Sequence, residues 1–484
     1  MPQVDLLVYD VGSTYTKVSA FNRYGTNLTF IGRSQAPTTV ENIEIGLIDA
    51  CRNLAHDLQW TEVISSRTLA TSSAAGGLRM VAMGYMPRVT AKAAKEVAMS
   101  AGARVLEIIS HETSVDFRLE VLQEIKPDII LLAGGTDGGD QDSLLENAEV
   151  IVNSKTHSVV IIAGNTEAQP KVEEVLKIGG ILTIRVPNVM PTIHELKVKP
   201  AREAIHQEFI RQITRAKGLG RLLEIVSNGR VIPTPGAVLM GTELLALGTH
   251  EKEGYGNILV IDIGGATTDV HSVLPDLANL TKEEMGLVVS NEKQLSYRTV
   301  EGNLGLRVSA TGIVETVGVS GVLAKVGFEG EELSKEIQVY AQYLEKNPEH
   351  ISIHEKEINF DKALAISAIE IAVKRHAGYF AQSFDPVLGI VPGTPVGRDL
   401  RKVQRVIAVG GIFAHLSKEA ALEILHKAFA NRGISLLPEK PEFVVDHNYQ
   451  LYAIGAMTEE YPNEALTLAE NIIFKDANNF ELRS

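Results

Sequence analysis

The sequence predicts an α/β protein made of two related lobes, with a further α/β segment inserted in the first lobe. Two observations predict this architecture. One pattern occurs twice, at 6–17 and 259–270, about 250 residues apart. It consists of an apolar strand that ends in Asp, a glycine turn and a hydroxyl-rich returning strand. Between about 61 and 200, short apolar runs alternate with helical patterns, which is typical of a parallel sheet with right-handed crossovers.

The composition is that of an ordinary soluble protein with more than one domain. The chain has 484 residues, 45% hydrophobic and 22% charged, whereas single cores stop growing beyond about 250–300 residues. A formal net charge of −14 argues against nonspecific nucleic-acid binding. No apolar run reaches the ~18 residues of a membrane span, and the N-terminus leads directly into a strand. We therefore expect a cytoplasmic protein with neither nucleic-acid nor membrane partners.

Common metal and redox motifs are missing from the sequence. Cys51 is the single cysteine, which excludes an internal disulfide and a cysteine-based zinc site. The thirteen histidines lack the His-Glu-x-x-His spacing of a metalloprotease. The chemistry must therefore come from other residues.

The first half of the chain is expected to open on an antiparallel meander followed by a helix. Apolar runs separated by Gly, Ser and Asn turns predict its strands at 4–10, 15–22 and 28–34, and helical spacing predicts a helix over about 41–57. In the inserted segment the predicted strands are 105–109, 129–133, 159–163 and 181–186, and the predicted helices are 91–100, 117–125, 143–153 and 167–178. The glycine-rich run 134–139 is interpreted as a strand-to-helix turn, with anion binding as the alternative.

The second half is expected to repeat the hairpin design after two connecting helices. Those helices are predicted at 201–216 and 237–247. The strands that follow are predicted at 257–264, 267–274, near 285–289, at 403–409 and at 443–446, with helical stretches at 306–346, 361–383 and from about 450. The expected segments are 1–84 (first lobe), 85–200 (inserted α/β subdomain), 201–250 (connecting helices), 251–445 (second lobe) and 446–484 (C-terminal helix and tail).

The two hairpins are suited to binding phosphate groups. Backbone amides and hydroxyls of such turns can surround phosphate oxygens, and an Asp at a strand end offers a hard oxygen to hydrated Mg²⁺. Asp10 and Asp262 are therefore the candidate metal-binding and catalytic residues. The candidate phosphate contacts are Gly12, Ser13, Thr14, Tyr15, Lys17, Gly264, Gly265, Thr267 and Thr268. For Lys17, a solvent-facing position on the strand is an equally good interpretation.

The order of these motifs resembles the actin-like ATPases, the superfamily that includes sugar kinases and heat-shock chaperones. The two hairpins match its phosphate-binding hairpins, 231–247 and 452–456 its connecting segments, and 409–411 its adenosine motif. The resemblance implies two ribonuclease-H-like lobes around a nucleotide cleft, with ATP and Mg²⁺ as cofactors. It places Gly410 and Gly411 against the adenosine, while Gly302 lies in a turn with either a nucleotide-contact or a purely structural role.

More specifically, the chain resembles the methylaspartate (glutamate) mutase accessory proteins. The resemblance lies in 10–17, 74–80, 132–139 and 301–307 and extends over essentially the full length. It implies an ATP-dependent reactivating chaperone, which hydrolyses ATP and exchanges damaged for intact cobalamin in an adenosylcobalamin-dependent mutase, either glutamate mutase or a related aminomutase. The mutase subunits would be its partners. The alternatives are a small-molecule kinase of the sugar or acetate kinase type and a filament-forming or scaffold relative.

One position departs from the chaperone pattern. Thr234 occupies the place where the chaperones carry a catalytic carboxylate. Either Asp269 or Glu243 takes over the orientation of water, or hydrolysis is slow. In the kinase alternative, Asp269 is the candidate base.

Overall fold

The described chain folds into two compact units. The core unit comprises Met1–Ala74 together with Lys217–Ser484, and the inserted unit comprises Ala75–Ala216. The computed structural model describes residues 3–12, 14–25, 27–39, 42–73, 79–84, 104–192, 197–213, 219–227, 229–276, 295–384 and 390–475. Ser13, the predicted helix 91–100 and the predicted strand 285–289 lie outside these residues.

The first lobe of the core unit is a five-stranded sheet with three antiparallel and two parallel strands. Its order is β3-β2-β1-β4-β10. Strands β1 and β2 and strands β2 and β3 pair antiparallel, whereas β4 pairs parallel with both β1 and β10. The strands are β1 (Gln3–Val11), β2 (Tyr15–Tyr24), β3 (Asn27–Pro37), β4 (Ile64–Ser72) and β10 (Val231–Pro233). Helix α1 (Ile43–Asp57), capped by Asn42, packs on β2 and β3.

The second lobe repeats this topology. Its sheet has the order β13-β12-β11-β16-β17, with the same sequence of antiparallel and parallel pairs. The strands are β11 (Ile258–Ile263), β12 (Thr268–Val273), β13 (Ser296–Glu301), β16 (Arg405–Val409) and β17 (Glu442–Val445). Two sheets of this order are two ribonuclease-H-like lobes, and the predicted fold class is confirmed.

The third described strand of the second lobe was not predicted from the sequence. It is β13, at Ser296–Glu301, whereas the predicted strand near 285–289 lies outside the described residues. Its sequence Ser-Tyr-Arg-Thr-Val-Glu contains the aromatic and β-branched residues that favour strands, a signal that the prediction overlooked.

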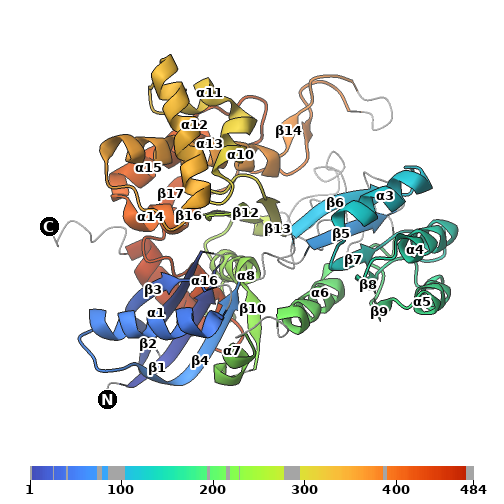
Figure 1. Cartoon of the computed structure of the whole chain (residues 1–484), viewed down its shortest axis with the longest axis horizontal. Coiled ribbons are helices and arrows are strands. Elements are labelled where there is room, and N and C mark those ends of the chain that lie inside the picture. Colours follow the sequence, from blue (N-terminus) through green and yellow to red (C-terminus); the bar gives the residue numbers. More distant parts are fainter. Residues whose placement is uncertain are drawn as a thin grey trace. The chain divides into compact units, whose positions relative to one another are not determined.

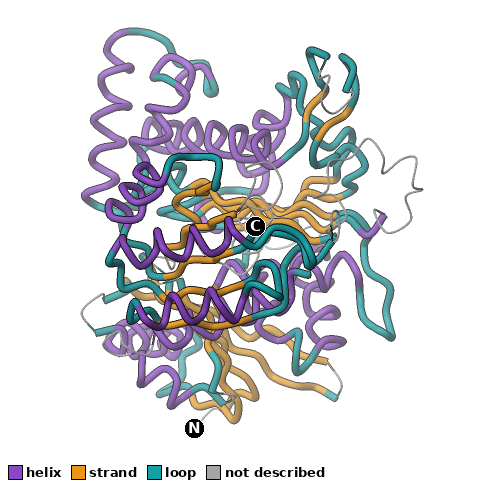
Figure 2. Tube along the Cα trace, turned by 90° about the vertical axis from the view of Figure 1, so that its right-hand side faces the viewer, coloured by secondary structure: helices purple, strands orange, loops and turns teal. Residues whose placement is uncertain are grey.

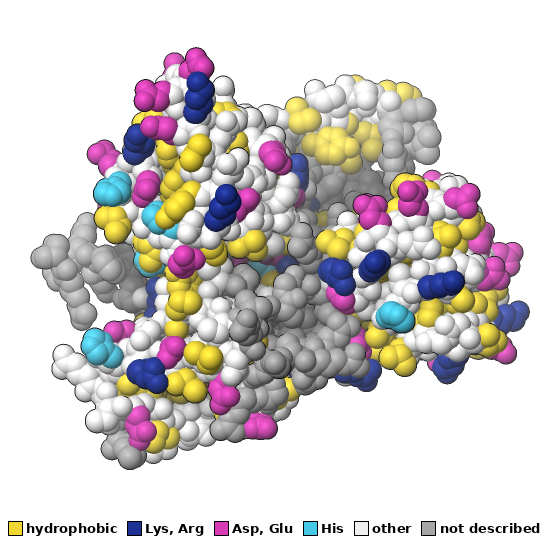
Figure 3. Space-filling view, in the orientation of Figure 1, with side chains coloured by type: hydrophobic (Ala, Val, Ile, Leu, Met, Phe, Trp, Pro, Cys, Tyr) yellow, Lys and Arg dark blue, Asp and Glu magenta, His cyan; other side chains and the backbone are white. Residues whose placement is uncertain are grey.

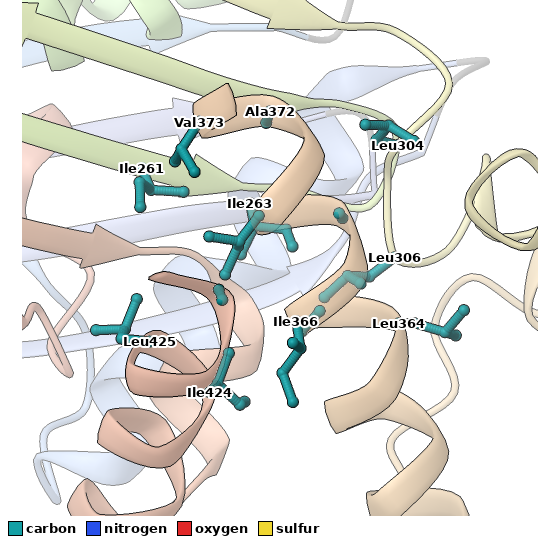
Figure 4. Packing of buried hydrophobic residues seen from close by; sticks show 14 of the residues in the cluster. Ile261, Ile263, Leu304, Leu306, Leu364, Ile366, Ala372, Val373, Ile424 and Leu425 are labelled. Atoms are coloured by element: carbon teal, nitrogen blue, oxygen red, sulfur yellow. The ribbon is translucent and has the colours of Figure 1, made fainter. Parts of the chain in front are cut away.

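Helices pack on one face of the second sheet and form the largest hydrophobic core within the described residues (Figures 1 and 2). Figure 4 shows Ile261 and Ile263 of β11 beside Val373 and Ile366 of the long helix. The predicted single stretch 306–346 is divided by Gly318 and Gly330, whose φ angles are 81° and 114°. The helices are α10 (Ala310–Val317), α11 (Val319–Ala324), α12 (Glu331–Lys346), α13 (Glu355–His376), α14 (Gly411–His415) and α15 (Lys418–Ala430), and the strands β14 (Tyr379–Phe380) and β15 (Pro395–Val396) form a small hairpin.

Two helices share a hydrophobic core with both sheets. Helix α8 (Thr234–Leu247) and helix α16 (Leu451–Met457) pack against apolar side chains of β1 and of β11. The two helices cross so closely that a Cβ on Gly455 would lie 1.7 Å from the Ala237 carbonyl oxygen. Helices α7 (Leu219–Ile225) and α17 (Pro462–Ala469) and a π-helical turn η2 (Glu470–Lys475) complete the unit. Among the described residues, no helix combines the length and apolar character needed to cross a bilayer.

The inserted unit is a doubly wound parallel sheet. Its order is β6-β5-β7-β8-β9, which corresponds to 2-1-3-4-5 within the unit, the order found in flavodoxin-like folds. The strands are β5 (Arg79–Gly84), β6 (Arg104–Ser110), β7 (Ile129–Leu132), β8 (Val159–Ile162) and β9 (Leu182–Arg185), and the helices are α3 (Val115–Ile125), α4 (Asp142–Ser154), α5 (Gln169–Ile178) and α6 (Val198–Ile213). The unit extends beyond the expected 85–200 at both ends. Strand β5 belongs to this sheet rather than to the first lobe, and α6, which covers most of the helix expected at 201–216 among the connecting helices, belongs to this unit as well.

The glycine-rich loop after β7 is held by side-chain amides. Asn165 Nδ2 donates to the Thr136 carbonyl over 2.9 Å, and Asn188 Nδ2 donates to the Gly135 carbonyl over 3.0 Å. The Asp137 carboxylate accepts bonds from Thr166 and Asn188. These contacts make the loop a braced strand-to-helix turn.

Candidate functional site

The first hairpin turns on a glycine. The antiparallel register pairs Asp10 with Lys17, and the Gly12 N–H donates to the Tyr15 carbonyl over 3.0 Å. A Cβ on Gly12 would lie 2.6 Å from the Tyr15 carbonyl oxygen, so a larger residue cannot adopt this turn unchanged. The turn places Thr14 and Tyr15 at the end of the hairpin.

Asp10 is buried and fully hydrogen-bonded. Its side chain is 1% exposed, and its Oδ2 lies 2.8 Å from Lys17 Nζ. Its Oδ1 accepts bonds from the hydroxyls of Thr71 (2.9 Å) and Thr234 (2.6 Å). Lys17 Nζ also lies over the ring of Tyr449, at 4.3 Å from its centroid. The lysine is therefore directed into the site and does not project from the strand into solvent.

Thr234 supports Asp10 from the first turn of α8. Its side chain is buried, and its hydroxyl donates to the Asp10 carboxylate. Thr234, which replaces the expected catalytic carboxylate, therefore fixes the orientation of Asp10, the candidate metal-binding residue.

The second hairpin brings two carboxylates together. The register pairs Asp262 directly with Asp269, so both side chains lie on one face of the sheet. Asp262 Oδ1 is buried and has no hydrogen-bond partner among the residues that the structure describes. Burial raises the pKa of Asp262 to about 7, and the neighbouring Asp269 and Asp10 add to this effect, whereas Lys17 opposes it. Groups of the first hairpin therefore act electrostatically on Asp262.

Asp269 is bound in a buried ion pair. Its Oδ1 accepts bonds from the Arg298 guanidinium, including one of 2.9 Å from Nε. Its Oδ2 accepts a 3.0 Å bond from the Thr267 hydroxyl. Arg298 lies on β13 and was not identified from the sequence, because its pairing with Asp269 depends on the register of strands 29 residues apart.

The turns of the two hairpins face each other. A Cβ on Gly265 would lie 3.1 Å from Thr14 Oγ1 and 3.5 Å from the Arg307 Cβ. The structure therefore brings together the end of the first hairpin and the end of the second.

The segment after β13 braces the second turn. Leu306 N–H and Arg307 N–H donate to the carbonyls of Gly264 (3.0 Å) and Gly265 (2.9 Å). The Thr268 hydroxyl donates to the Leu304 carbonyl over 2.6 Å and is therefore already used inside the second lobe. Gly302 directly follows β13 and begins this segment.

The two glycines after β16 differ in their surroundings. Gly410 has a φ of 137°, and a Cβ there would lie 2.2 Å from the Ile263 carbonyl oxygen. Gly411 has no atom within 4 Å of an added Cβ. Gly410 therefore lets the chain pass close to the end of β11, whereas Gly411 leaves open space beside the backbone.

Glu243 lies far along α8 from Thr234. It lies on α8 nine positions after Thr234, which corresponds to about 13 Å at 1.5 Å per residue. This separation makes it unsuited to orient water beside Asp10.

The carboxylates fit a hydrated Mg²⁺ ion. Asp10 and Asp262 supply hard oxygens, and the buried Asp262 Oδ1 lacks a donor. Within the described parts of the chain, no three His, Cys, Asp or Glu side chains are grouped to hold an ion directly. Contact through the waters of the ion is therefore the form of binding that these residues fit.

Fold and site together define a two-lobed ribonuclease-H-like protein with two facing hairpins, each with an Asp two residues before a glycine. The chain belongs to the MutL protein family, whose model matches residues 6–473. It is 35% identical to Protein MutL of Clostridium tetanomorphum over 471 residues, covering 97% of this chain and 99% of that protein.

Solved structures show weaker likeness. Acetone carboxylase without nucleotide is 14% identical with a TM-score of 0.38, covering 94% of this chain and 70% of that chain. Gluconate kinase from Lactobacillus acidophilus is 12% identical with a TM-score of 0.34, covering 98% of this chain and 95% of that chain. Because both TM-scores are low, the fold class rests on the strand order of this chain itself.

Proposed function

We propose that the two hairpins bind the phosphates of Mg·ATP. The observation that carries this proposal is the approach of Gly265 to Thr14, together with an oxygen of Asp262 that lacks a partner among the described residues. Asp10 and Asp262 would hold the waters of Mg²⁺, which neutralises phosphate charge when it is bound. Lys17 would exchange its contact with Asp10 for one with a phosphate oxygen.

Two features favour slow turnover over rapid phosphoryl transfer. Thr234 occupies the position where the chaperones carry a catalytic carboxylate, and its hydroxyl is bonded to Asp10. Both oxygens of Asp269 accept bonds, from Arg298 and Thr267. Since a kinase needs a base that can accept the proton of its substrate, these contacts favour a nucleotide switch over a small-molecule kinase.

We further propose that this switch acts as an ATP-dependent reactivating chaperone of an adenosylcobalamin-dependent mutase in the cytoplasm. ATP that contacts both lobes favours their closed arrangement by its differential affinity, and hydrolysis removes this bias. The cycle would loosen the mutase subunits, so that damaged cobalamin leaves and intact cobalamin enters. Support comes from the resemblance to glutamate mutase accessory proteins and from a second folded unit available for contact with a partner.

Recovery of an inactivated mutase tests this function. The mutase is inactivated with hydroxocobalamin and incubated with the chain, Mg²⁺, ATP and fresh adenosylcobalamin. We expect activity to return with ATP, at most one round of exchange with a nonhydrolysable analogue, and no recovery with Asp262→Ala. Absence of recovery, together with stoichiometric phosphorylation of a metabolite, would instead support the kinase.

A further inference from the structure

The segment that follows α12 is bonded to both hairpins. The Glu349 carbonyl accepts a 3.0 Å bond from the hydroxyl of Tyr15, in the turn of the first hairpin. The next carbonyl, that of His350, accepts a 3.2 Å bond from Arg307 Nε. Because the Arg307 N–H is bonded to Gly265, this segment links the two turns.

A buried carboxylate fixes the inner side of the segment. Asp361 on α13 accepts bonds from Arg307 Nη2 at 3.0 Å and from the Ser352 hydroxyl at 2.8 Å. The hydroxyl oxygens of Ser352 and Tyr340 lie 2.6 Å apart, which ties the segment to α12. A displacement of this segment would therefore be transmitted to the hairpin turns.

The outer side of the segment is apolar and exposed. Ile351 and Ile353 flank the inward-directed Ser352 and are 46% and 81% exposed. Beside them on α12, Val339 and Tyr343 are 65% and 43% exposed and lie one turn apart on one helix face. We call Val339, Tyr343, Ile351 and Ile353 the α12 patch.

Contacts along the segment place these four side chains together. Ser352 lies against Tyr340, and the Lys356 ammonium lies 3.0 Å from Glu336, so the segment runs back along α12. The ring of Tyr343 lies 5.1 Å from that of His350. In Figure 3, hydrophobic side chains are visible among acidic ones on the second lobe, in the region that α12 occupies in Figure 1. Exposed apolar residues that adjoin one another mark interaction surfaces more often than scattered ones do.

The charge around the patch selects the kind of occupant. Residues 329–357 contain eight glutamates and three lysines. A second copy of this chain would present the same acidic surroundings and carries a net charge of −14, so self-association is disfavoured. The complementary partner presents an apolar area framed by lysine and arginine side chains.

We propose that the α12 patch is the docking surface for a mutase subunit that presents an apolar area framed by lysine and arginine side chains. This inference rests on the proposed function and adds the place of contact. The partner would bind the outer side of the segment whose inner side holds the two hairpins, which couples docking to the nucleotide site.

Two exposed isoleucines, one in the α12 patch and one on α1, provide a matched pair of test variants. Ile353→Asp places a charge in the patch, and Ile48→Asp places one on α1, where the isoleucine is 49% exposed. Binding of each purified full-length variant to the mutase is measured by biolayer interferometry with Mg·ATP present. We expect Ile353→Asp to raise the Kd at least tenfold and Ile48→Asp to change it less than twofold, with unchanged ATP affinity for both.

The other possible results would show which part is wrong: the docking surface, its occupant or the proposed function. If the wild-type chain binds the mutase and Ile353→Asp binds equally well, or if both variants are equally weakened, the patch is not the docking surface. If sedimentation shows a wild-type dimer that Ile353→Asp dissociates, the occupant is a second copy and the proposal is overturned. If the wild-type chain does not bind the mutase in any nucleotide state, the proposed function itself is wrong, and the assignment of the patch to the mutase is wrong with it.

Discussion

Single residues make the two hairpins chemically different despite their common backbone design. Across from Asp10 lies Lys17, so the first hairpin carries a neutralised pair. Across from Asp262 lies Asp269, and Arg298 compensates only one of these two charges. The first hairpin therefore supplies the cation, and the second supplies the unsatisfied carboxylate.

Removal of the unsatisfied carboxylate is expected to abolish nucleotide binding without loss of fold. The raised pKa of Asp262 shows that its charged form is unfavourable where it lies, so Asp262→Ala should not lower the free energy of unfolding near neutral pH. Asp10→Ala should also abolish Mg²⁺-dependent activity. Calorimetric titration with Mg·ATP measures the loss, and Asp49→Ala on the exposed side of α1 is the control. Wild-type ATP hydrolysis by either site variant would contradict the metal assignment.

Thr234→Val tests the support of Asp10. The substitution leaves the Thr71 hydroxyl as the donor to Asp10 Oδ1, and a lost bond to a buried carboxylate costs about 1–3 kcal/mol of stability. We expect a corresponding decrease in the free energy of urea unfolding. Thr242→Val on the same helix is the control, because that hydroxyl donates only to the Val238 carbonyl. Equal stability of the two variants would show that the Thr234 contact is dispensable.

The sequence pointed to the candidate residues but not to their partners. Asp10 and Asp262 are evident from the motif because each follows an apolar strand before a glycine turn. The contacts of Thr71, Thr234 and Arg298 were not predictable, because they join positions separated by up to 224 residues. Such pairs depend on sheet register and helix placement, which a local pattern does not contain.

At the scale of elements, strands next to turns were well predicted. The strands β1, β2, β11 and β12 lie within two or three residues of the predicted ranges, because a glycine turn adjoins each of them. The helices after β13 were less well divided. Their breaks require positive φ at glycines, and the sequence alone did not show which glycines adopt it.

Gly265→Val tests whether the second turn approaches a phosphate. A side chain at this position would meet Thr14 Oγ1 and the Arg307 Cβ and would block the backbone amides of the turn. We expect Gly265→Val and Gly264→Val to lower ATP affinity at least tenfold, with a smaller effect on thermal stability. Affinities equal to wild type in calorimetry would show that these glycines form a turn and nothing more.

Tyr15→Phe tests the link between the lobes. The substitution removes the hydroxyl that donates to Glu349, a bond whose net value is about 0.5–1.5 kcal/mol, so nucleotide release should accelerate about 2- to 10-fold. Tyr24→Phe, at the far end of the same strand and 64% exposed, is the control. Stopped-flow displacement of a fluorescent ATP analogue gives both rates. Identical rates for the two variants would contradict a role of this bond in holding the nucleotide.

At the scale of the molecule, the repeat of hairpins correctly predicted two lobes, whereas the borders of the insertion differ from those expected. Strand β5 is an apolar run like those of the first lobe, and only its pairing with β6 and β7 assigns it to the inserted unit. Pairing partners of parallel strands depend on crossovers, which the local sequence does not specify.

Stability of the whole core unit is expected to depend on Asp446, which caps α16. Burial raises the pKa of this carboxyl to about 6, although its Oδ2 accepts the N–H groups of Gln450 and Leu451. Because the folded state binds this proton more tightly than the unfolded state, whose pKa is about 4, stability from this group is lost as the pH rises from about 4 to 6.

Asp446→Asn should remove this pH dependence. The amide oxygen can still accept the two backbone bonds, so the variant should exceed wild type by up to about 3 kcal/mol above pH 6 and lose the advantage below about pH 4. Urea unfolding across this range measures the difference, with Asp49→Asn as the exposed control. A constant difference between Asp446→Asn and wild type at all pH values would contradict the assignment.

The order of the chain has a consequence for its synthesis. Strands β4 and β10 are neighbours in the first sheet, yet the whole inserted unit lies between them in sequence. A ribosome adding about 5–20 residues per second needs roughly 8 to 30 s to pass from one strand to the other. During that interval β4 is an open edge with unpaired backbone groups, which favours aggregation. The inserted unit, which is contiguous and has its own core, can fold in the meantime, so translation favours an insertion that is native before the lobe that carries it.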